Sequence, residues 1–188
     1  EAGYGPNLGP LVVAATAWRL NGAEPRDLYE RLSGVITCDP REKSQRLLVA
    51  ASKAVYQPGG GLAALERGVL GALRSQNASH LQDWQATLET LQADPESERI
   101  TQPWRAEHNP KLATEADDAL LRETGEQLRC CCKTSKTQPP LLRARIVYPA
   151  EFNTLVETHG TKGAALSHVT LGLVRRFMDQ IEPNWTSG

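Results

Sequence analysis

The chain has 188 residues, of which 40% are hydrophobic and 5% aromatic, and its formal net charge is −1. This length suits one domain or two small ones, and the apolar fraction is far above that of disordered chains. Few aromatic residues and many alanines and leucines favour packed helices over a β-sandwich. No apolar run reaches the roughly 18 residues of a membrane helix, and residues 1–10 lack a signal-peptide pattern. We therefore expect no membrane partner and a cytoplasmic, nucleoid or nuclear location.

A helical domain is expected over residues 11–132, after an irregular arm rich in Gly and Pro at residues 1–10. Capping signals and apolar residues at helical spacing mark its helices. Asp39, for example, can cap the turn that follows, and Glu42 can bond back to it. The helices expected in this domain are residues 11–20, 25–36, 40–55, 62–73, 79–91 and 114–131.

Residue patterns of catalytic and metal sites are missing from the sequence. The triple glycine at 59–61 is not followed by Lys and Ser or Thr, so it is not a phosphate loop. The four histidines have no metal-binding spacing, and no serine lies in a nucleophile elbow. Cys130–Cys132 are adjacent and form no Cys-x-x-Cys pair, so we expect free thiols, with a disulfide to Cys38 as the alternative. The sequence thus predicts a protein that is not an enzyme and has no metal or cofactor.

The charges are distributed unevenly along the chain. Residues 129–188 hold eight Lys or Arg and four Asp or Glu, so the rest of the chain is acidic. A basic end on an acidic body points to an anionic partner.

A linker at 133–140 precedes a strand-helix-helix pattern at 141–182, and residues 183–188 form a tail. Apolar and other residues alternate from Leu142 to Tyr148, which predicts a half-buried strand. Pro149 can begin the first helix, Gly160 can close it, and Thr161 can cap the second. The fold class expected for the chain is mainly α, with a helical body and this C-terminal unit.

The order of these elements, with an aromatic-Pro junction at 148–149, resembles the ribbon-helix-helix family of DNA-binding repressors. The resemblance implies a homodimer in which two copies of the strand form a ribbon in the major groove of duplex DNA. A twin strand is also expected because a lone strand needs a partner and no second strand is predicted in the chain. The implied function is that of a DNA-binding regulator or accessory protein. The implied DNA-contacting residues are Arg143, Arg145, Val147, Thr161 and Lys162.

Two alternatives come from the helical body. GAEPRDLYERL at 22–32 and the helix that follows through Val55 resemble the N-terminal domains of retroviral capsid proteins. SQNASHLQDWQATLETL at 75–91 resembles the homology segment of the capsid C-terminal domain. This resemblance implies a self-assembling structural protein. A helical module that binds other proteins through its body is the third class of function.

Overall fold

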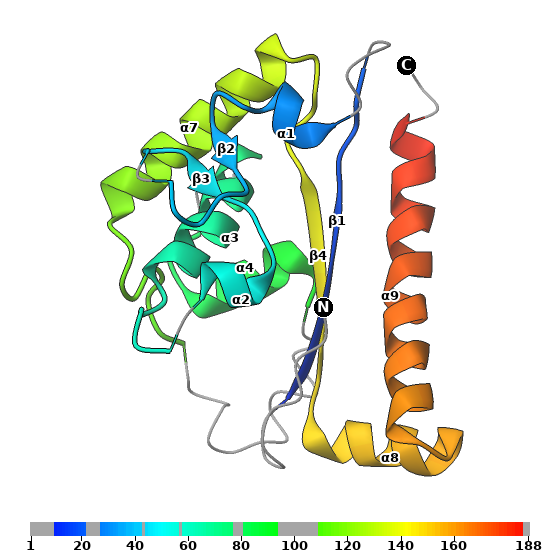
Figure 1. The fold of residues 1–188 in the computed structure, drawn as a ribbon. Coiled ribbons are helices and arrows are strands. Elements are labelled where there is room, and N and C mark those ends of the chain that lie inside the picture. Colours follow the sequence, from blue (N-terminus) through cyan, green and yellow to red (C-terminus); the bar gives the residue numbers. More distant parts are fainter. Residues whose placement is uncertain are drawn as a thin grey trace. The chain divides into compact units, whose positions relative to one another are not determined.

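The structure is a computed structural model, and it describes most of the chain between Pro10 and Trp185, with side chains as far as Ile181 (Figure 1). The described residues are 10–21, 27–42, 44–56, 58–76, 81–93 and 109–185. Contacts between residues divide the chain into two compact units. Unit 1 comprises Glu1–Thr16, Thr87–His108 and Leu142–Gly188, and unit 2 comprises Ala17–Ala86 and Asn109–Leu141.

Unit 1 is built on a two-stranded sheet of β1 (Leu11–Ala17) and β4 (Leu141–Val147). The two strands run in opposite directions (Figure 1). The prediction of a helix over residues 11–20 is therefore wrong. Along β1 buried and exposed residues alternate, but Val12 on the exposed side is as apolar as Val13 on the buried side. Because both sides are apolar, the period of two that identifies a strand is hidden in the sequence.

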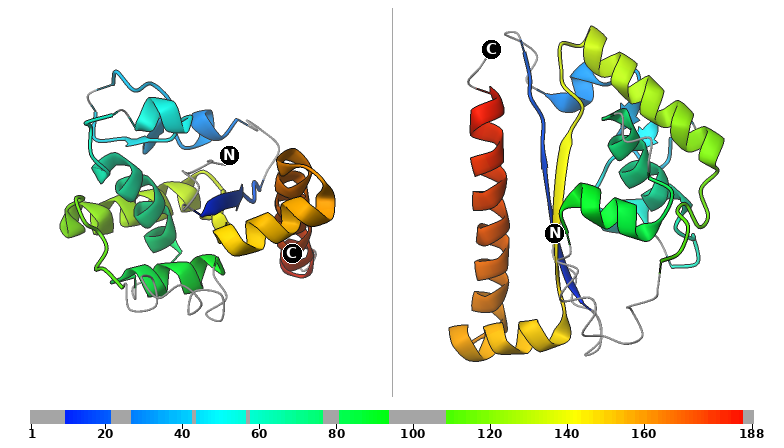
Figure 2. Two further views of the ribbon diagram at one scale, coloured as in Figure 1. Left: turned by 90° about the horizontal axis from the view of Figure 1, so that it is seen from below. Right: turned by 180° about the vertical axis from the view of Figure 1, so that it is seen from behind.

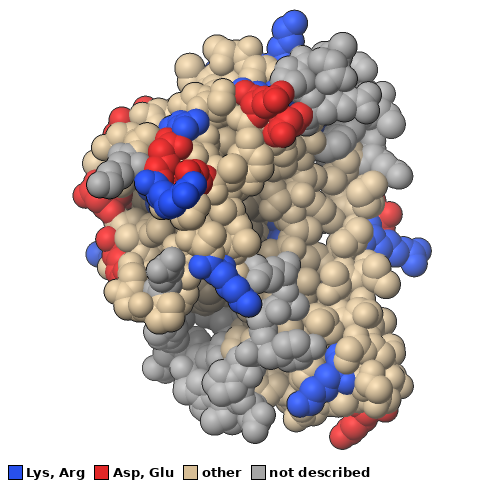
Figure 3. Space-filling view, in the orientation of Figure 1, with Lys and Arg blue, Asp and Glu red and all other residues tan. Residues whose placement is uncertain are grey.

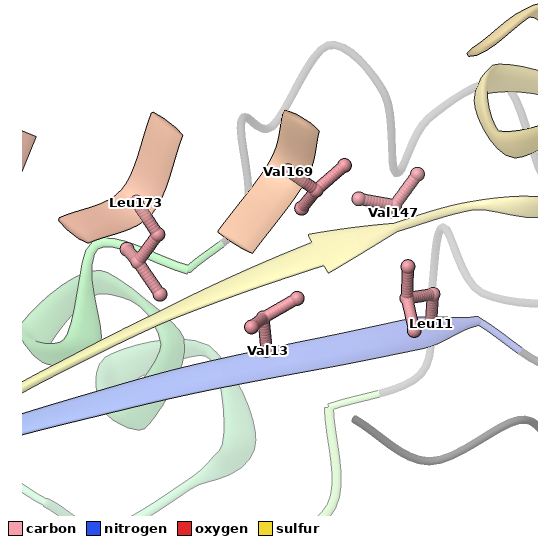
Figure 4. Packing of buried hydrophobic residues seen from close by; sticks show 5 residues of the cluster. All are labelled: Leu11, Val13, Val147, Val169 and Leu173. Carbon is pink, nitrogen blue, oxygen red and sulfur yellow. The ribbon is translucent and has the colours of Figure 1, made fainter. Parts of the chain in front are cut away.

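Helices cover both faces of this sheet. On one face, β1 and Val147 of β4 pack against α9 (Lys162–Trp185) (Figure 4). On the other face, Ala144 and Ile146 pack against α4 (Trp84–Leu91) and the residues after it. The N–H of Ile146 also donates to the Ala93 carbonyl at 2.9 Å, on the edge of β4 that β1 leaves open. The core of unit 1 thus joins segments far apart in the sequence.

The order strand, helix, helix predicted for residues 141–182 is confirmed. Pro149 occupies the first turn of α8 (Pro149–His159), where its fixed φ suits a helix start. Gly160 closes α8 with a φ of 80°, a left-handed conformation that glycine adopts at little cost. These elements are not a separate C-terminal unit, however, because they share their sheet and core with β1 and α4.

Unit 2 packs α3 (Ala63–Ser75) against α7 (Asp118–Thr134). The two helices cross at Gly71 and Gly125, where the backbones approach closely. The smaller elements are α1 (Leu28–Arg31), β2 (Ile36–Thr37), β3 (Leu47–Leu48) and α2 (Ser52–Val55). β2 and β3 pair in parallel, with Ile36 opposite Leu47. Figure 2 shows the elements from two further sides.

The helix predicted over residues 40–55 is replaced by a loop, β3 and the short α2. Asp39 accepts the Arg41 N–H at 2.9 Å, and Glu42 accepts Arg46 and Thr37 side chains. These carboxylates therefore stabilise a turn. The residues that cap a helix can also accept hydrogen bonds within a turn, and here the turn forms in place of the helix.

Helices account for 53% of the structure, with seven among the described residues. The predicted helices at 62–73, 79–91 and 114–131 correspond to α3, α4 and α7. Helix thus predominates as expected, but the two small sheets make the fold mixed α/β, so the mainly-α prediction holds only in part.

Glu42 provides a test of the loop in unit 2. Hydrogen bonds from Arg46, and then from Ser44 and Thr37, lower the pKa of Glu42 from 4.5 to about 2. Since the folded pKa lies below the ordinary value, the stabilisation is complete above pH 4.5 and is lost as the pH falls towards 2. We expect an NMR titration to place the Glu42 midpoint near 2, and Arg46→Ala to move it towards 4.5. Arg41→Ala is the control, because Arg41 binds Asp39 instead. A wild-type midpoint near 4.5 would contradict these contacts.

Candidate functional site

The two arginines predicted to read DNA bases are held inside unit 1. Arg143 Nε donates to Gln180 Oε1 at 2.9 Å, and burial lowers the pKa of its guanidinium. Arg145 Nη2 binds Glu151 Oε1 at 2.7 Å, and the side chains of this pair are only 17% and 30% exposed. The arginines thus join β4 to α9 and α8 and are not presented on an open face.

Val147, the third predicted base-contacting residue, is 0% exposed. It lies in a cluster with Leu11, Val13, Val169 and Leu173 (Figure 4). A base contact from Val147 would therefore require α9 to move away from the sheet. The argument that β4 needs a twin strand is also wrong, since β1 of the same chain pairs with it.

Thr161 and Lys162, the predicted phosphate-binding residues, are exposed at the start of α9. The Thr161 hydroxyl accepts the N–H of Ala164 at 3.1 Å, which is the helix cap predicted from the sequence. These two residues are accessible, and the three on β4 are largely or wholly covered. The structure therefore does not bring the five predicted residues together on one exposed surface.

On the face shown in Figure 3, charged side chains of both signs are interspersed, and the described Lys and Arg residues form no broad basic patch there. No three His, Cys, Asp or Glu side chains among the described residues could hold a metal ion together. Cys38 and Cys130 are exposed free thiols, and Cys132 is buried, which raises its pKa to about 11. A buried thiol with a raised pKa is a poor nucleophile at neutral pH.

The side of α9 that faces away from the sheet is unusually apolar. Leu171 is 68% exposed, the largest value among the exposed large hydrophobic residues, and Val174 and Met178 are 44% and 49% exposed. The spacing of these three residues places them on one side of the helix. The exposed residues Ala164 and Ser167 lie on the same side, closer to the start of α9. We define the outer face of α9 as these five residues: Ala164, Ser167, Leu171, Val174 and Met178.

The apolar residues of the outer face are visible in the sequence, but the apolar residues of the inner face of the same helix make them hard to recognise. Apolar residues at Val169, Leu173 and Phe177 account for one buried side and satisfy the amphipathic pattern. The outer residues repeat separately, with Leu171 and Met178 seven apart and Val174 between them. A second apolar stripe on one helix is the signal that could have identified this face beforehand.

A polar groove in unit 2 is the second candidate site. It has a volume of about 1020 Å³ and lies between α7 and the segment around Lys111. Asp83 and Lys111 form an antiparallel bridge that makes one wall. Arg122 and Arg129 of α7 line the other wall. The sequence offered little to predict this groove, because its walls come from segments that are distant in the chain.

Within the described ranges, no helix is long and apolar enough to cross a membrane. Comparison with known proteins finds no match to this chain among protein families, curated proteins or solved structures.

Proposed function

We propose that this chain is a binding protein that associates with a second copy of itself through the outer face of α9. The observation that carries the proposal is the exposure of Leu171, Val174 and Met178 on one side of one helix. Single exposed apolar residues are ordinary, but a contiguous apolar stripe on a folded surface is typical of an interaction site.

A second α9 is the partner that fits this stripe. Leu171 and Met178 are seven residues apart, and Ser167 and Val174 are also seven apart. This is the spacing of a helix-packing seam, in which large and small side chains of two helices interlock. α9 has 24 residues, so it offers a straight surface about 36 Å long.

Charge favours an antiparallel arrangement of the two helices. His168 and Arg175 are exposed along one flank of the outer face. A parallel pair would set each Arg175 beside its own copy, and like charges at such positions oppose pairing. In an antiparallel pair, Leu171 lies opposite Val174 of the second copy and the two Arg175 side chains are offset. Such a two-fold contact is also the commonest symmetry of protein dimers.

The size of the apolar stripe determines how tightly we expect the two copies to associate. A stable interface buries about 800 Å² on each partner, which is more than three half-exposed side chains supply. Full burial of a large apolar side chain contributes about 1.5–3 kcal/mol, and association has its own entropic cost. We therefore expect a reversible dimer that forms as the protein concentration rises.

Sedimentation equilibrium over a concentration series tests this proposal. Wild type is expected to shift from monomer to dimer, and Val174→Glu is expected to stay monomeric because it places a charge in the seam. Val69→Glu is the matched control, since Val69 is also a helical valine and is 42% exposed, on α3 of unit 2. A monomer at every concentration, or equal loss of the dimer in both variants, would refute the proposal.

Duplex DNA is a second candidate ligand, and the exposure of Thr161 and Lys162 at a helix start favours it. The prediction from the sequence is salt-dependent binding, which Lys162→Ala weakens for all DNA sequences alike. A fluorescence titration with duplex DNA over a salt series checks it, and affinity unaffected by Lys162→Ala would remove this site.

A further inference from the structure

The groove in unit 2 has two well-defined walls. In one wall the Trp84 N–H donates to the Pro110 carbonyl at 2.9 Å, and the Leu112 N–H donates to the Gln82 carbonyl at 3.1 Å. These bonds hold Lys111 beside Asp83 at the groove. The other wall is α7 from Asp118 to Arg129, and Arg74 of α3 also lines the groove.

Seven of the thirteen described residues that line the groove are charged, four of them cations and three of them acids. The four cations are Arg74, Lys111, Arg122 and Arg129, and the three acids are Asp83, Asp118 and Glu126. The apolar residues among the described lining are Leu81, Leu112, Ala113 and Ala116. Seven charged residues around one groove suit a charged ligand.

Two of the three acids already have partners in the protein. Asp118 accepts Arg74 Nη2 at 2.6 Å and Arg122 Nη2 at 2.5 Å, one guanidinium on each carboxylate oxygen. Asp83 accepts the Ala86 N–H at 2.9 Å at the start of α4. These contacts engage both carboxylates, which leaves Glu126 as the remaining acid.

Two of the four cations, Lys111 and Arg122, keep N–H groups for which no partner is seen among the described residues. Lys111 is exposed, and its ammonium has no partner among the described residues. The Arg122 side chain is 70% exposed and uses Nη2 for Asp118, so further N–H groups of its fork face solvent. Arg122 and Lys111 come from opposite walls, and both border the groove.

We infer that this groove binds a ligand through its phosphate groups, with Lys111 and Arg122 as the phosphate-binding residues. Guanidinium and ammonium groups are the side chains that most often hold phosphate, and a fork such as that of Arg122 can bind two of its oxygens. The inference is independent of self-association through α9.

The dimensions favour a chain of phosphates over a single one. The groove, at about 1020 Å³, is much larger than one phosphate ion. On α7 the cations continue from Arg122 through Arg129 to Lys133, over about 16 Å of helix. A series of cations along a groove is typical of surfaces that follow the backbone of single-stranded nucleic acid.

A fluorescence anisotropy titration with a labelled 15-residue oligothymidylate, over a salt series, tests the inference. The wild-type chain is expected to bind with an affinity that falls as salt rises. Lys111→Ala and Arg122→Ala are each expected to weaken binding several-fold and to lower the salt slope by about 0.7. Lys53→Ala is the matched control, because Lys53 is an exposed lysine of unit 2 outside the groove. Circular dichroism of each variant checks that it is folded.

Two competitors identify the source of the phosphate. Displacement of the oligonucleotide by tripolyphosphate, with loss of that effect in Lys111→Ala, would support a phosphate site of any origin. Displacement by polyglutamate but not by tripolyphosphate would overturn the inference in favour of an acidic protein partner. Weakening by Lys162→Ala but not by Lys111→Ala would also overturn it, and would place binding at the start of α9. Absence of binding at low salt would overturn it outright.

Discussion

Replacing Gly125 with alanine is expected to destabilise unit 2, although alanine is the better helix former. A Cβ at Gly125 would lie 2.8 Å from Arg74 Cβ and 3.3 Å from the Gly71 carbonyl oxygen. These atoms belong to the backbone and first carbon of α3, so they cannot rotate away. The higher helix propensity of alanine stabilises the folded state by up to about 1 kcal/mol. Overpacking acts in the opposite direction and typically costs about 1–3 kcal/mol. We expect a net loss of about 1–2 kcal/mol in the free energy of unfolding.

Gly68→Ala is the control, because the opposite change in the free energy of unfolding is expected for it. Gly68 lies in α3, the helix that Gly125 packs against, and a Cβ there would meet nothing within 4 Å. Gly68→Ala is therefore expected to stabilise unit 2 by about 0.5–1 kcal/mol. Urea unfolding followed by circular dichroism measures both variants. Equal effects of the two substitutions would show that the close crossing of α3 and α7 is wrong.

Arg145→Ala is expected to lower stability rather than to act only on DNA affinity. Its guanidinium binds Glu151 at 2.7 Å in a pair whose side chains are mostly covered. Exposed pairs contribute about 0–1 kcal/mol, and loss of one partner of a buried pair costs about 3–5 kcal/mol. For this intermediate case we expect a loss of about 1–3 kcal/mol, again measured by urea unfolding.

Two further variants test whether the loss of stability in Arg145→Ala comes from its pair with Glu151. Arg41→Ala should leave stability unchanged, because Arg41 is 88% exposed in its pair with Asp39. In Glu151→Ala, a second change of Arg145 to Ala should cost less than it does alone, since the pair is already broken. Unchanged stability in Arg145→Ala, together with weaker binding to duplex DNA, would instead support the base-contacting role implied by the family resemblance.

The parts of the fold that could be predicted are those set by local sequence. α3, α4 and α7 follow from apolar residues at helical spacing. The strand at 141–147, Pro149 at the first turn of α8 and the left-handed Gly160 follow in the same way. Each of these features depends on neighbours within a few residues.

The features that could not be predicted depend on distant partners or on ambiguous local signals. β1 is a strand because β4 lies beside it, and nothing in LVVAATA separates that outcome from a short helix. Asp39 and Glu42 look like helix-capping residues, but Arg41 and Arg46 draw them into a turn. The alternation at Arg143 and Arg145 correctly predicts a strand, but it cannot show that helices cover both of its faces.

The most direct test of self-association through α9 is an isotope-filtered NMR experiment on a mixture of labelled and unlabelled chains. It detects contacts only between different copies of the protein. We predict such contacts at the methyl groups of Leu171, Val174 and Met178 in concentrated samples, with Leu171 of one copy close to Val174 of the other. Val69, a valine of nearly equal exposure on α3, should show none. Contacts between copies at other methyl groups, with none on the outer face of α9, would contradict the account.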